Sequence, residues 1–195
     1  MSSKHETSSF LTLQDHIDAA LLSSRRILIG NAIDNDLAED VIKKVWYLEK
    51  EDSKKPITFI INSPGGSIDA GFAIWDQMQM IKCPKITVVT GIAASMGSIL
   101  MLAGDKKKRF ATPMSRVMIH QPALSGVVQG QATDLEIQAK EILKMKEQII
   151  EIYMHSTGKT KEAVEKALDR DTWMTAKEAM KWGLVDSITS SFDDL

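Results

Sequence analysis

The sequence predicts an α/β fold built around a largely parallel sheet. Short β-branched runs alternate with segments of helical period, which is the order of a β–α–β protein. The strand candidates read as buried on both faces, as strands covered by helices do. The chain has 195 residues, of which 44% are hydrophobic and 26% charged, an ordinary globular composition. This length allows roughly 70% of the unfolded surface to be buried, so folding needs no metal ion or disulfide.

The first two predicted strands flank a helix. Arg26–Ile29 and Ile57–Ile61 are apolar runs of the kind that strands favour. Between them, residues 36–51 have helical periodicity, and Asp36 with Glu39 has the spacing of a capping box. We therefore expect a helix from Asp36 to Glu51.

A turn, Asn62-Ser-Pro-Gly-Gly66, separates the second strand from a helix expected over Ala70–Ile81. One interpretation is a tight turn in which proline fixes φ and glycine supplies a positive φ. The other is a backbone nest that brings N–H groups close to a ligand at a helix N-terminus. The pair Cys83-Pro84 stops the helix.

Residues 86–104 carry no charge over a length close to that of a membrane span. The stretch contains threonines, glycines and serines, which disfavour insertion into a bilayer. We interpret it as a buried strand, Ile86–Thr90, followed by a buried helix over Ser95–Ala103. Another strand is predicted at Arg116–Ile119.

The last third is predicted to be mostly helical. Thr133 and Glu136 have capping-box spacing, a long helix runs to about Ser156, and Gly158 closes it. A helix of this length often projects and packs on another subunit. Its apolar positions are expected to be buried: Leu135, Ala139, Ile142 and Ile149. Shorter helices are expected over residues 162–168 and from a third capping box at 175–178.

Charge, cysteine count and the N-terminus bear on partners and location. The net charge of −2 gives no reason to expect nucleic acid or an acidic membrane as a partner. We interpret the cationic run Lys106–Arg109 as a solvated turn. The single cysteine, Cys83, favours a reducing compartment. Residues 1–9 lack the apolar core of an export signal, so we expect a cytoplasmic protein.

Several enzyme classes leave no trace in the sequence. It contains no G-x-x-x-x-G-K-[ST] and no G-x-G-x-x-G after a strand. The four histidines show no metal-ligand spacing. We therefore expect no cofactor and no metal ion in this chain.

Ser95 lies at the junction of a strand and a helix, in Gly91-Ile-Ala-Ala-Ser-Met-Gly97. One interpretation is an ordinary helix N-cap. The other is a nucleophile, because small neighbours allow a sharp turn at the sheet edge where α/β proteins bind ligands. The segment is not a strict G-x-S-x-G elbow, since Ala93 replaces the first glycine.

Two further side chains suit a serine nucleophile. His120 follows the strand predicted at Arg116–Ile119. A histidine there is either structural or a base that titrates near neutrality. Asp171 precedes a hydrophobic pair and is either a solvated carboxylate or the group that orients an imidazole.

Together these segments resemble the proteolytic subunit of the Clp protease, the ClpP family. The motifs occur in the family's order and near its spacing over roughly residues 25–188. They are Ile61-Asn-Ser-Pro-Gly-Gly66, Gly91-Ile-Ala-Ala-Ser-Met-Gly97, Ser115-Arg-Val-Met-Ile-His-Gln-Pro122, Gly130-Gln-Ala-Thr-Asp134, Asp169-Arg-Asp171 and Trp182-Gly-Leu-Val-Asp186.

The resemblance implies a serine endopeptidase with the ClpP/crotonase-type α/β fold, a spiral of β-β-α units with a projecting handle strand and helix. It makes Ser95 the nucleophile, His120 the base and Asp171 the orienting acid. It places the oxyanion hole on the backbone N–H groups of Gly66 and Met96. It divides the chain into an axial segment with a first helix (1–24), a peptidase domain (25–188, handle about 123–156) and a tail (189–195).

The resemblance also implies partners. The family builds seven-membered rings stacked in pairs around a closed chamber, and Asp169 with Arg170 matches a pair that contacts the opposite ring. A ring-shaped Clp ATPase, which uses the ATP, unfolds protein substrates and threads them in. A second ClpP paralogue in the same assembly is the alternative to homogeneous rings.

Three features depart from the family's pattern. The segment 120–134 is slightly longer, and residues 1–18 lack the usual start, which leaves the axial role open. Thr58 and Ile60 stand where the family has tyrosines in the pocket that docks the ATPase, so docking of altered strength or specificity is expected. A specialised paralogue active only in a mixed ring is therefore an alternative. A crotonase-type acyl-CoA enzyme is a second, which the complete triad disfavours.

Overall fold

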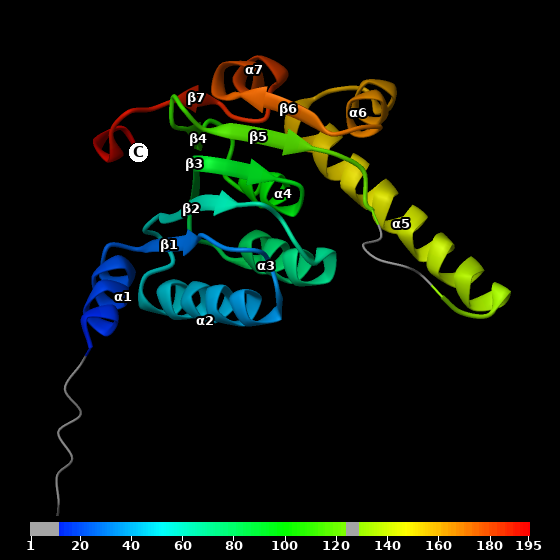
Figure 1. Cartoon of the computed structure of the whole chain (residues 1–195). Helices are drawn as coiled ribbons and strands as arrows, with labels where there is room; N and C mark the ends of the chain where they lie inside the picture. Colours follow the sequence, from blue (N-terminus) through cyan, green and yellow to red (C-terminus); the bar gives the residue numbers. More distant parts are fainter. Residues whose placement is uncertain (1–11, 124–128) are drawn as a thin grey trace, which may run out of the picture.

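The computed structural model describes residues 12–123 and 129–195, which form a seven-stranded sheet with helices packed against it (Figure 1). This confirms the predicted α/β class. In chain order the elements are α1 (Leu13–Ser23), β1 (Arg26–Ile29), α2 (Asn35–Glu51), β2 (Ile57–Ser63), α3 (Ile68–Met80), β3 (Lys85–Ala94), α4 (Met96–Met101), β4 (Arg109–Ala111), β5 (Arg116–Ile119), α5 (Ala132–Thr157), α6 (Lys161–Leu168), β6 (Thr172–Thr175), α7 (Ala176–Trp182), β7 (Ser187–Ile188) and the 3-10 helix η1 (Phe192–Asp194).

The sheet is parallel except at one strand. The path β1-β2-β3-β4-β7 is parallel throughout, and β3 is long enough to pair with β4 first and then with β5. β6 runs antiparallel to β5. This strand brings the segment around residue 171 beside the end of β5, although the two are far apart in the sequence.

The two faces of the central strands have different surroundings. Residues such as Ile29, Phe59 and Val89 belong to the main core, which α2, α3 and α4 share. On the alternate positions, strand register aligns Leu28, Ile60, Val88 and Phe110 in one row across β1 to β4. Leu195 packs against a small separate cluster that includes the last two.

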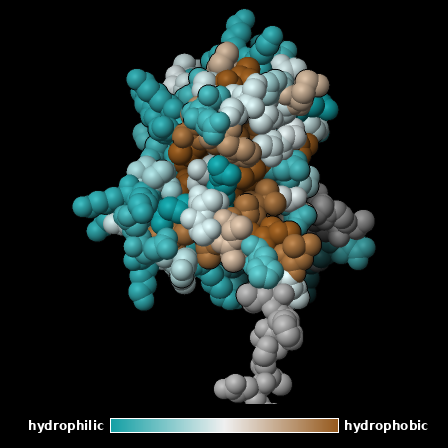
Figure 2. Space-filling model, turned by 90° about the vertical axis from the view of Figure 1, so that its left-hand side faces the viewer, coloured by the Kyte–Doolittle hydropathy of each residue, from teal (hydrophilic) through white to brown (hydrophobic). Residues whose placement is uncertain are grey.

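Hydrophobic surface gathers on the side of the molecule where α1 and the C-terminal segment lie. Figure 2 shows it near the centre of that side, with hydrophilic side chains around it. Leu28 in β1 is 48% exposed, and Phe192 in η1 is 45% exposed with the guanidinium of Arg26 over its ring. Exposed apolar area of this kind is typical of an interaction surface.

Two predicted capping boxes are wrong. α2 begins at Asn35, and the side chain of Asp34 accepts from the N–H of Leu37, so Asp36 lies inside the first turn. α5 begins at Ala132 after Gln131, so Thr133 is already helical. In both cases the backbone turns helical earlier than the capping-box pattern indicates. The third predicted box, Thr175 with Glu178, is confirmed.

The helix α5 projects from the body of the molecule (Figure 1). Its buried side chains are confined to its last third, at Ile149, Ile150 and Tyr153. The expectation of burial is therefore wrong for Leu135 and Ala139, which are exposed, and for Ile142, which is only half-buried, because the helix leaves the core there; it is confirmed for Ile149. Residues 124–128, within the region expected to hold the handle strand and the longer loop, lie outside the described residues, as do residues 1–11.

The cationic run before β4 is not simply a solvated turn. Arg109 is 7% exposed, and its guanidinium forms two hydrogen bonds to Asp186, at 3.0 and 2.6 Å. A third bond, from the Nη1 of Arg109, reaches the carbonyl of Ser156 at 3.0 Å. This pair ties β4 to the segment between α7 and β7.

The uncharged stretch 86–104 is confirmed as part of a strand followed by a helix. β3 continues to Ala94, further than predicted, and α4 spans Met96–Met101. Across the described parts of the chain, no helix combines the length and apolar character needed to cross a membrane.

Candidate active site

Three strand ends bring the predicted catalytic side chains together. Ser95 directly follows β3 and His120 directly follows β5; the two strands are parallel, with Ala94 beside Met118. The N–H of Ser95 donates to the carbonyl of Met118 at 2.9 Å. β6 pairs with β5 in the antiparallel direction, with Ile119 opposite Thr172, so Asp171 lies next to His120.

The three side chains form a continuous hydrogen-bonded set. The Nε2 of His120 lies 2.8 Å from the Oγ of Ser95, and its Nδ1 lies 3.2 Å from the Oδ1 of Asp171. A carboxylate only accepts, so Nδ1 carries the proton toward Asp171 and Nε2 accepts from the serine hydroxyl. The carboxyl side chain is 63% exposed and the imidazole 26%, so the site opens to solvent.

Ser95 has the backbone of an exposed nucleophile. Its φ of 53° and ψ of −123° lie in a region that residues with a Cβ rarely adopt. Its hydroxyl points to His120, so the interpretation as an ordinary N-cap is wrong. The backbone of residue 65 packs so closely against Ser95 that only glycine fits there: an added Cβ would lie 2.7 Å from the Cβ of Ser95.

Two backbone amides suit a developing oxyanion. Met96 is the first residue of α4, and a helix leaves its first N–H groups without an intrahelical acceptor. The N–H of Ile33 donates to the carbonyl of Gly65, and the carbonyl of Ile33 accepts from the N–H of Ser67. Neither bond uses the N–H of Gly66, which lies between them. Gly66 and Met96 both line the pocket beside Ser95.

That pocket has a volume of about 490 Å³ and is mainly apolar. A cavity of this volume can hold an apolar amino-acid side chain. Sequence reasoning did not identify its walls, because they come from separate elements with no shared motif. Besides the predicted site residues, they are Ser67, Ile68, Ile99, Pro122, Ala123, Ile149 and Tyr153.

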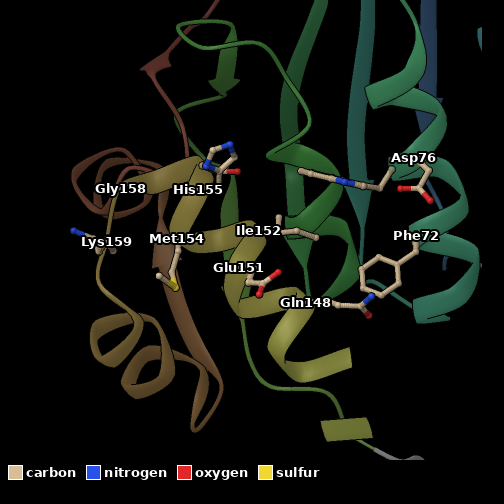
Figure 3. A pocket seen from close by; sticks show the side chains of 11 residues that line it. Phe72, Asp76, Gln148, Glu151, Ile152, Met154, His155, Gly158 and Lys159 are labelled. Carbon is tan, nitrogen blue, oxygen red and sulfur yellow. The ribbon is translucent and has the colours of Figure 1, made fainter. Parts of the chain in front are cut away.

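A larger hollow of about 780 Å³ lies between α3 and the last turns of α5 (Figure 3). Phe72 and Asp76 line it from α3, and Gln148, Ile152 and His155 from α5. The described residues around this hollow include none of those predicted for catalysis, so it is separate from the site.

Asp169 and Arg170 lie on the surface just before Asp171. The carbonyl of Asp169 accepts from the Nε2 of Gln121 at 3.1 Å and from the guanidinium of Arg170 at 2.8 Å. The first of these bonds ties the 169–171 segment to the chain that follows His120. Both side chains are exposed in the single chain.

Comparison with known proteins covers the part of the chain that holds these residues. The chain matches the Clp protease family over residues 12–192. It belongs to the Clp protease family. It is 60% identical over 183 residues to the "ATP-dependent Clp protease proteolytic subunit 1" of Protochlamydia amoebophila, covering 94% of this chain and 89% of that protein. Proteins of the same name from Chlamydia trachomatis and Chlamydia pneumoniae are 57% and 55% identical, covering 95% and 96% of those proteins.

These matches confirm the family, the fold and the activity expected from the sequence. The chain is a serine peptidase, and so a hydrolase, of the kind that serves as proteolytic subunit in ATP-dependent proteolysis. Membership also implies an oligomeric assembly and a partnership with Clp ATPases.

Proposed function

We propose that this chain cleaves unfolded polypeptides into short peptides, with Ser95 as nucleophile, His120 as general base and Asp171 as the orienting acid. The observation that carries the proposal is the hydrogen-bonded set of these side chains, with the imidazole 2.8 Å from the serine hydroxyl. Their chain order, Ser–His–Asp, differs from that of the α/β-hydrolases, but the roles depend on geometry alone.

The acylation step follows from the proton positions. The Oγ of Ser95 attacks the substrate carbonyl carbon while the Nε2 of His120 takes the hydroxyl proton. The tetrahedral intermediate then collapses, the C–N bond breaks, and the imidazolium returns the proton to the leaving amine. A water molecule, activated by the same imidazole, hydrolyses the acyl-enzyme and restores the serine.

Two backbone amides stabilise the oxyanion of that intermediate. The N–H groups of Gly66 and Met96 border the pocket next to Ser95, where the carbonyl oxygen of a bound substrate would lie. Removing one such donor typically costs about 10²–10³ in rate. The nucleophile, base and oxyanion donors all come from this chain, so we propose that it uses neither a metal ion nor a cofactor.

We further propose that the assembly consists of two stacked rings of seven copies around a chamber. The projecting helix α5 supports this arrangement, because Leu143 and Ile137 on it are 60% and 55% exposed in the single chain. In the proposed division of the chain, the peptidase domain is 25–188, an axial segment precedes it, and a tail follows. Asp169 and Arg170 then lie at the contact between rings.

A Clp ATPase, which consumes the ATP, is proposed to dock on the row that contains Ile60. Thr58 and Ile60 are half-buried on that face of the sheet, beside the exposed Leu28. Leu195 packs against the neighbouring cluster, so the C-terminal segment borders the same surface. A docking surface without the family's tyrosines is expected to differ in strength or specificity.

The alternative is a specialised subunit that is active only in a mixed ring. The relatives' name, proteolytic subunit 1, agrees with a chain that works beside a second proteolytic subunit. In that case the same triad operates, but its alignment depends on the partner.

The test is degradation of fluorescein-labelled casein with and without a Clp ATPase and ATP. The chain is assayed alone and mixed with a second ClpP subunit whose own nucleophile has been removed. We expect ATP-dependent release of short peptides in one of the two preparations and none from the matched Ser95→Ala particle. Casein degradation that Ser95→Ala leaves unchanged would contradict the assignment.

A further inference from the structure

A buried chain of hydrogen bonds reaches the backbone of Ser95 from the helix α5. Tyr153 is 1% exposed, and its hydroxyl lies 2.6 Å from the Oγ of Ser98 in α4. That Oγ lies 2.6 Å from the carbonyl oxygen of Ser95. The N–H of Ser98 donates to the same oxygen at 2.9 Å. The mechanism above uses neither Tyr153 nor Ser98.

The direction of the protons in this chain follows from its ends. A carbonyl oxygen only accepts, so the single hydroxyl proton of Ser98 is donated to Ser95. The proton between Tyr153 and Ser98 therefore belongs to the phenol, which is the donor. Burial raises the pKa of the Tyr153 phenol well above its usual value, so the phenol keeps this proton at neutral pH. In a low-dielectric interior, consecutive hydrogen bonds of this kind strengthen one another.

The carbonyl at which this series of hydrogen bonds ends belongs to Ser95, whose backbone is strained. Ser95 has a φ of 53°, and such a conformation persists only when its surroundings over-determine it. The carbonyl of Ser95 and the N–H of Met96 lie in one rigid peptide plane. Two hydrogen bonds that hold the carbonyl therefore also fix the direction in which the N–H of Met96 points.

We propose that Tyr153 and Ser98 are positioning residues that aim the Met96 N–H at the oxyanion through the carbonyl of Ser95. The inference rests on the proposed function, because it assigns both residues an indirect role in the acylation of Ser95 by the substrate. Tyr153 is itself held in place, with its ring edge-on to Trp182 at 6.3 Å and 87°. Tyr153 lies in the last turns of α5, where that helix packs on the core. The position of α5 relative to α4 is therefore coupled to the oxyanion hole.

The chain offers a matched control for each test variant. Tyr153→Phe removes the hydroxyl and keeps the ring, and Tyr47→Phe does the same at a tyrosine that is 55% exposed. Ser98→Ala is matched by Ser115→Ala. Ser115 is 1% exposed, and its Oγ donates to the carbonyl three residues earlier at 2.7 Å, as that of Ser98 does.

The experiment measures kcat and KM for a short fluorogenic peptide in the active particle. It also measures the rate at which a fluorophosphonate phosphonylates Ser95 with loss of fluoride, followed by the mass of this chain. We expect Tyr153→Phe to lower kcat and the phosphonylation rate about threefold to tenfold, and Ser98→Ala about tenfold or more. KM stays within about twofold, because the phenyl ring still lines the pocket. The double variant is no slower than Ser98→Ala, because both substitutions interrupt the same series of hydrogen bonds.

A purely structural role would move a different readout. If Tyr153→Phe and Ser98→Ala lower the thermal midpoint but react as fast as Tyr47→Phe and Ser115→Ala, the inference is overturned. Rates are normalised to the fraction of chain that labels at completion, so misfolded molecules do not count. Failure of the wild-type Ser95 to label in the active particle would instead contradict the proposed function.

Discussion

Gly66 has a close contact that accounts for the second glycine of the turn. A Cβ added there would lie 2.2 Å from the carbonyl oxygen of Ile33, and its φ is 152°. Any larger residue must therefore push the turn away from Ile33 and move the N–H of residue 66. The position combines a steric requirement with a catalytic one.

We predict that Gly66→Ala lowers kcat by about 10²–10³, the effect of losing one oxyanion donor. Gly158→Ala is the control, because Gly158 also has a positive φ, of 71°, but an added Cβ would meet nothing within 4 Å. The control is expected to lose about 1 kcal/mol of stability and no activity. Peptide hydrolysis and thermal unfolding of the two variants, measured side by side, check this. Equal loss of kcat in both would show that backbone strain, not the oxyanion donor, is responsible.

The ion pair between the buried Arg109 and the half-buried Asp186 predicts a pH dependence of stability. Burial alone would raise the pKa of Asp186, but hydrogen bonds from Arg109 outweigh it and hold the pKa below the ordinary 3.8. A carboxyl whose pKa is lowered by folding stabilises the fold above its unfolded pKa and ceases to do so as the pH falls through its folded pKa. Asp186→Asn is expected to cost about 1–2 kcal/mol at pH 7, with a difference from the wild type that shrinks below about pH 4. Thermal midpoints at several pH values measure it; a difference that stays constant down to pH 3 would contradict it.

Single residues differ in how far the sequence reveals them. Ser95 and His120 could be predicted because each follows a strand and belongs to a local motif. Arg109 could not, because its partner Asp186 is 77 residues away and the neighbouring lysines resemble a solvated turn. Tyr153 has the same difficulty, since it meets Ser98 across 55 residues and looks locally like a core position.

At the scale of elements, length decides what periodicity can reveal. The predicted strands at 26–29, 57–61 and 116–119 were found because each is a clear apolar run. β4 and β7 have only three and two residues, too few for a pattern of alternation. β6 is as long as β1 and β5, but its sequence, Thr-Trp-Met-Thr, is not an apolar run. β6 is the strand that places Asp171, so tertiary pairing completes the triad.

The helix starts can be tested directly at α2. We predict that Asp34→Ala lowers the free energy of unfolding by about 1 kcal/mol, because it removes the acceptor for the N–H of Leu37. Asp36→Ala, at the position that the sequence pattern favours, is the control and is expected to cost less. Chemical denaturation of the two variants distinguishes the caps. The reverse order of stabilities would place the cap at Asp36.

At the scale of the whole molecule, the account depends on an assembly that the single chain prepares for. The apolar side chains of α5 beyond the core are exposed, which is costly unless another subunit covers them. Sequence reasoning could predict the projecting helix from its length. It could not predict which of its apolar positions face outward, because the helical period is the same inside and outside the core.

We predict that Leu143→Glu reduces the particle to smaller species and lowers peptide hydrolysis with them. A charge at a position buried between subunits costs several kcal/mol, enough to shift the assembly equilibrium by orders of magnitude. Met114→Glu, at a side chain that is 90% exposed in the turn between β4 and β5, is the control. Light scattering coupled to size-exclusion chromatography measures the particle. An unchanged mass for Leu143→Glu would remove this face of α5 from the proposed ring contact.

The central claim is that a hydroxyl on residue 95 is activated by the imidazole on residue 120. The most direct measurement is fluorophosphonate labelling of the active particle, with the modified residue located by mass spectrometry of its peptides. The account predicts one adduct, on Ser95, in the wild type, and labelling slowed by several orders of magnitude in His120→Ala. An active particle whose adduct lies on another residue of this chain, or a His120→Ala particle that labels at the wild-type rate, would contradict it.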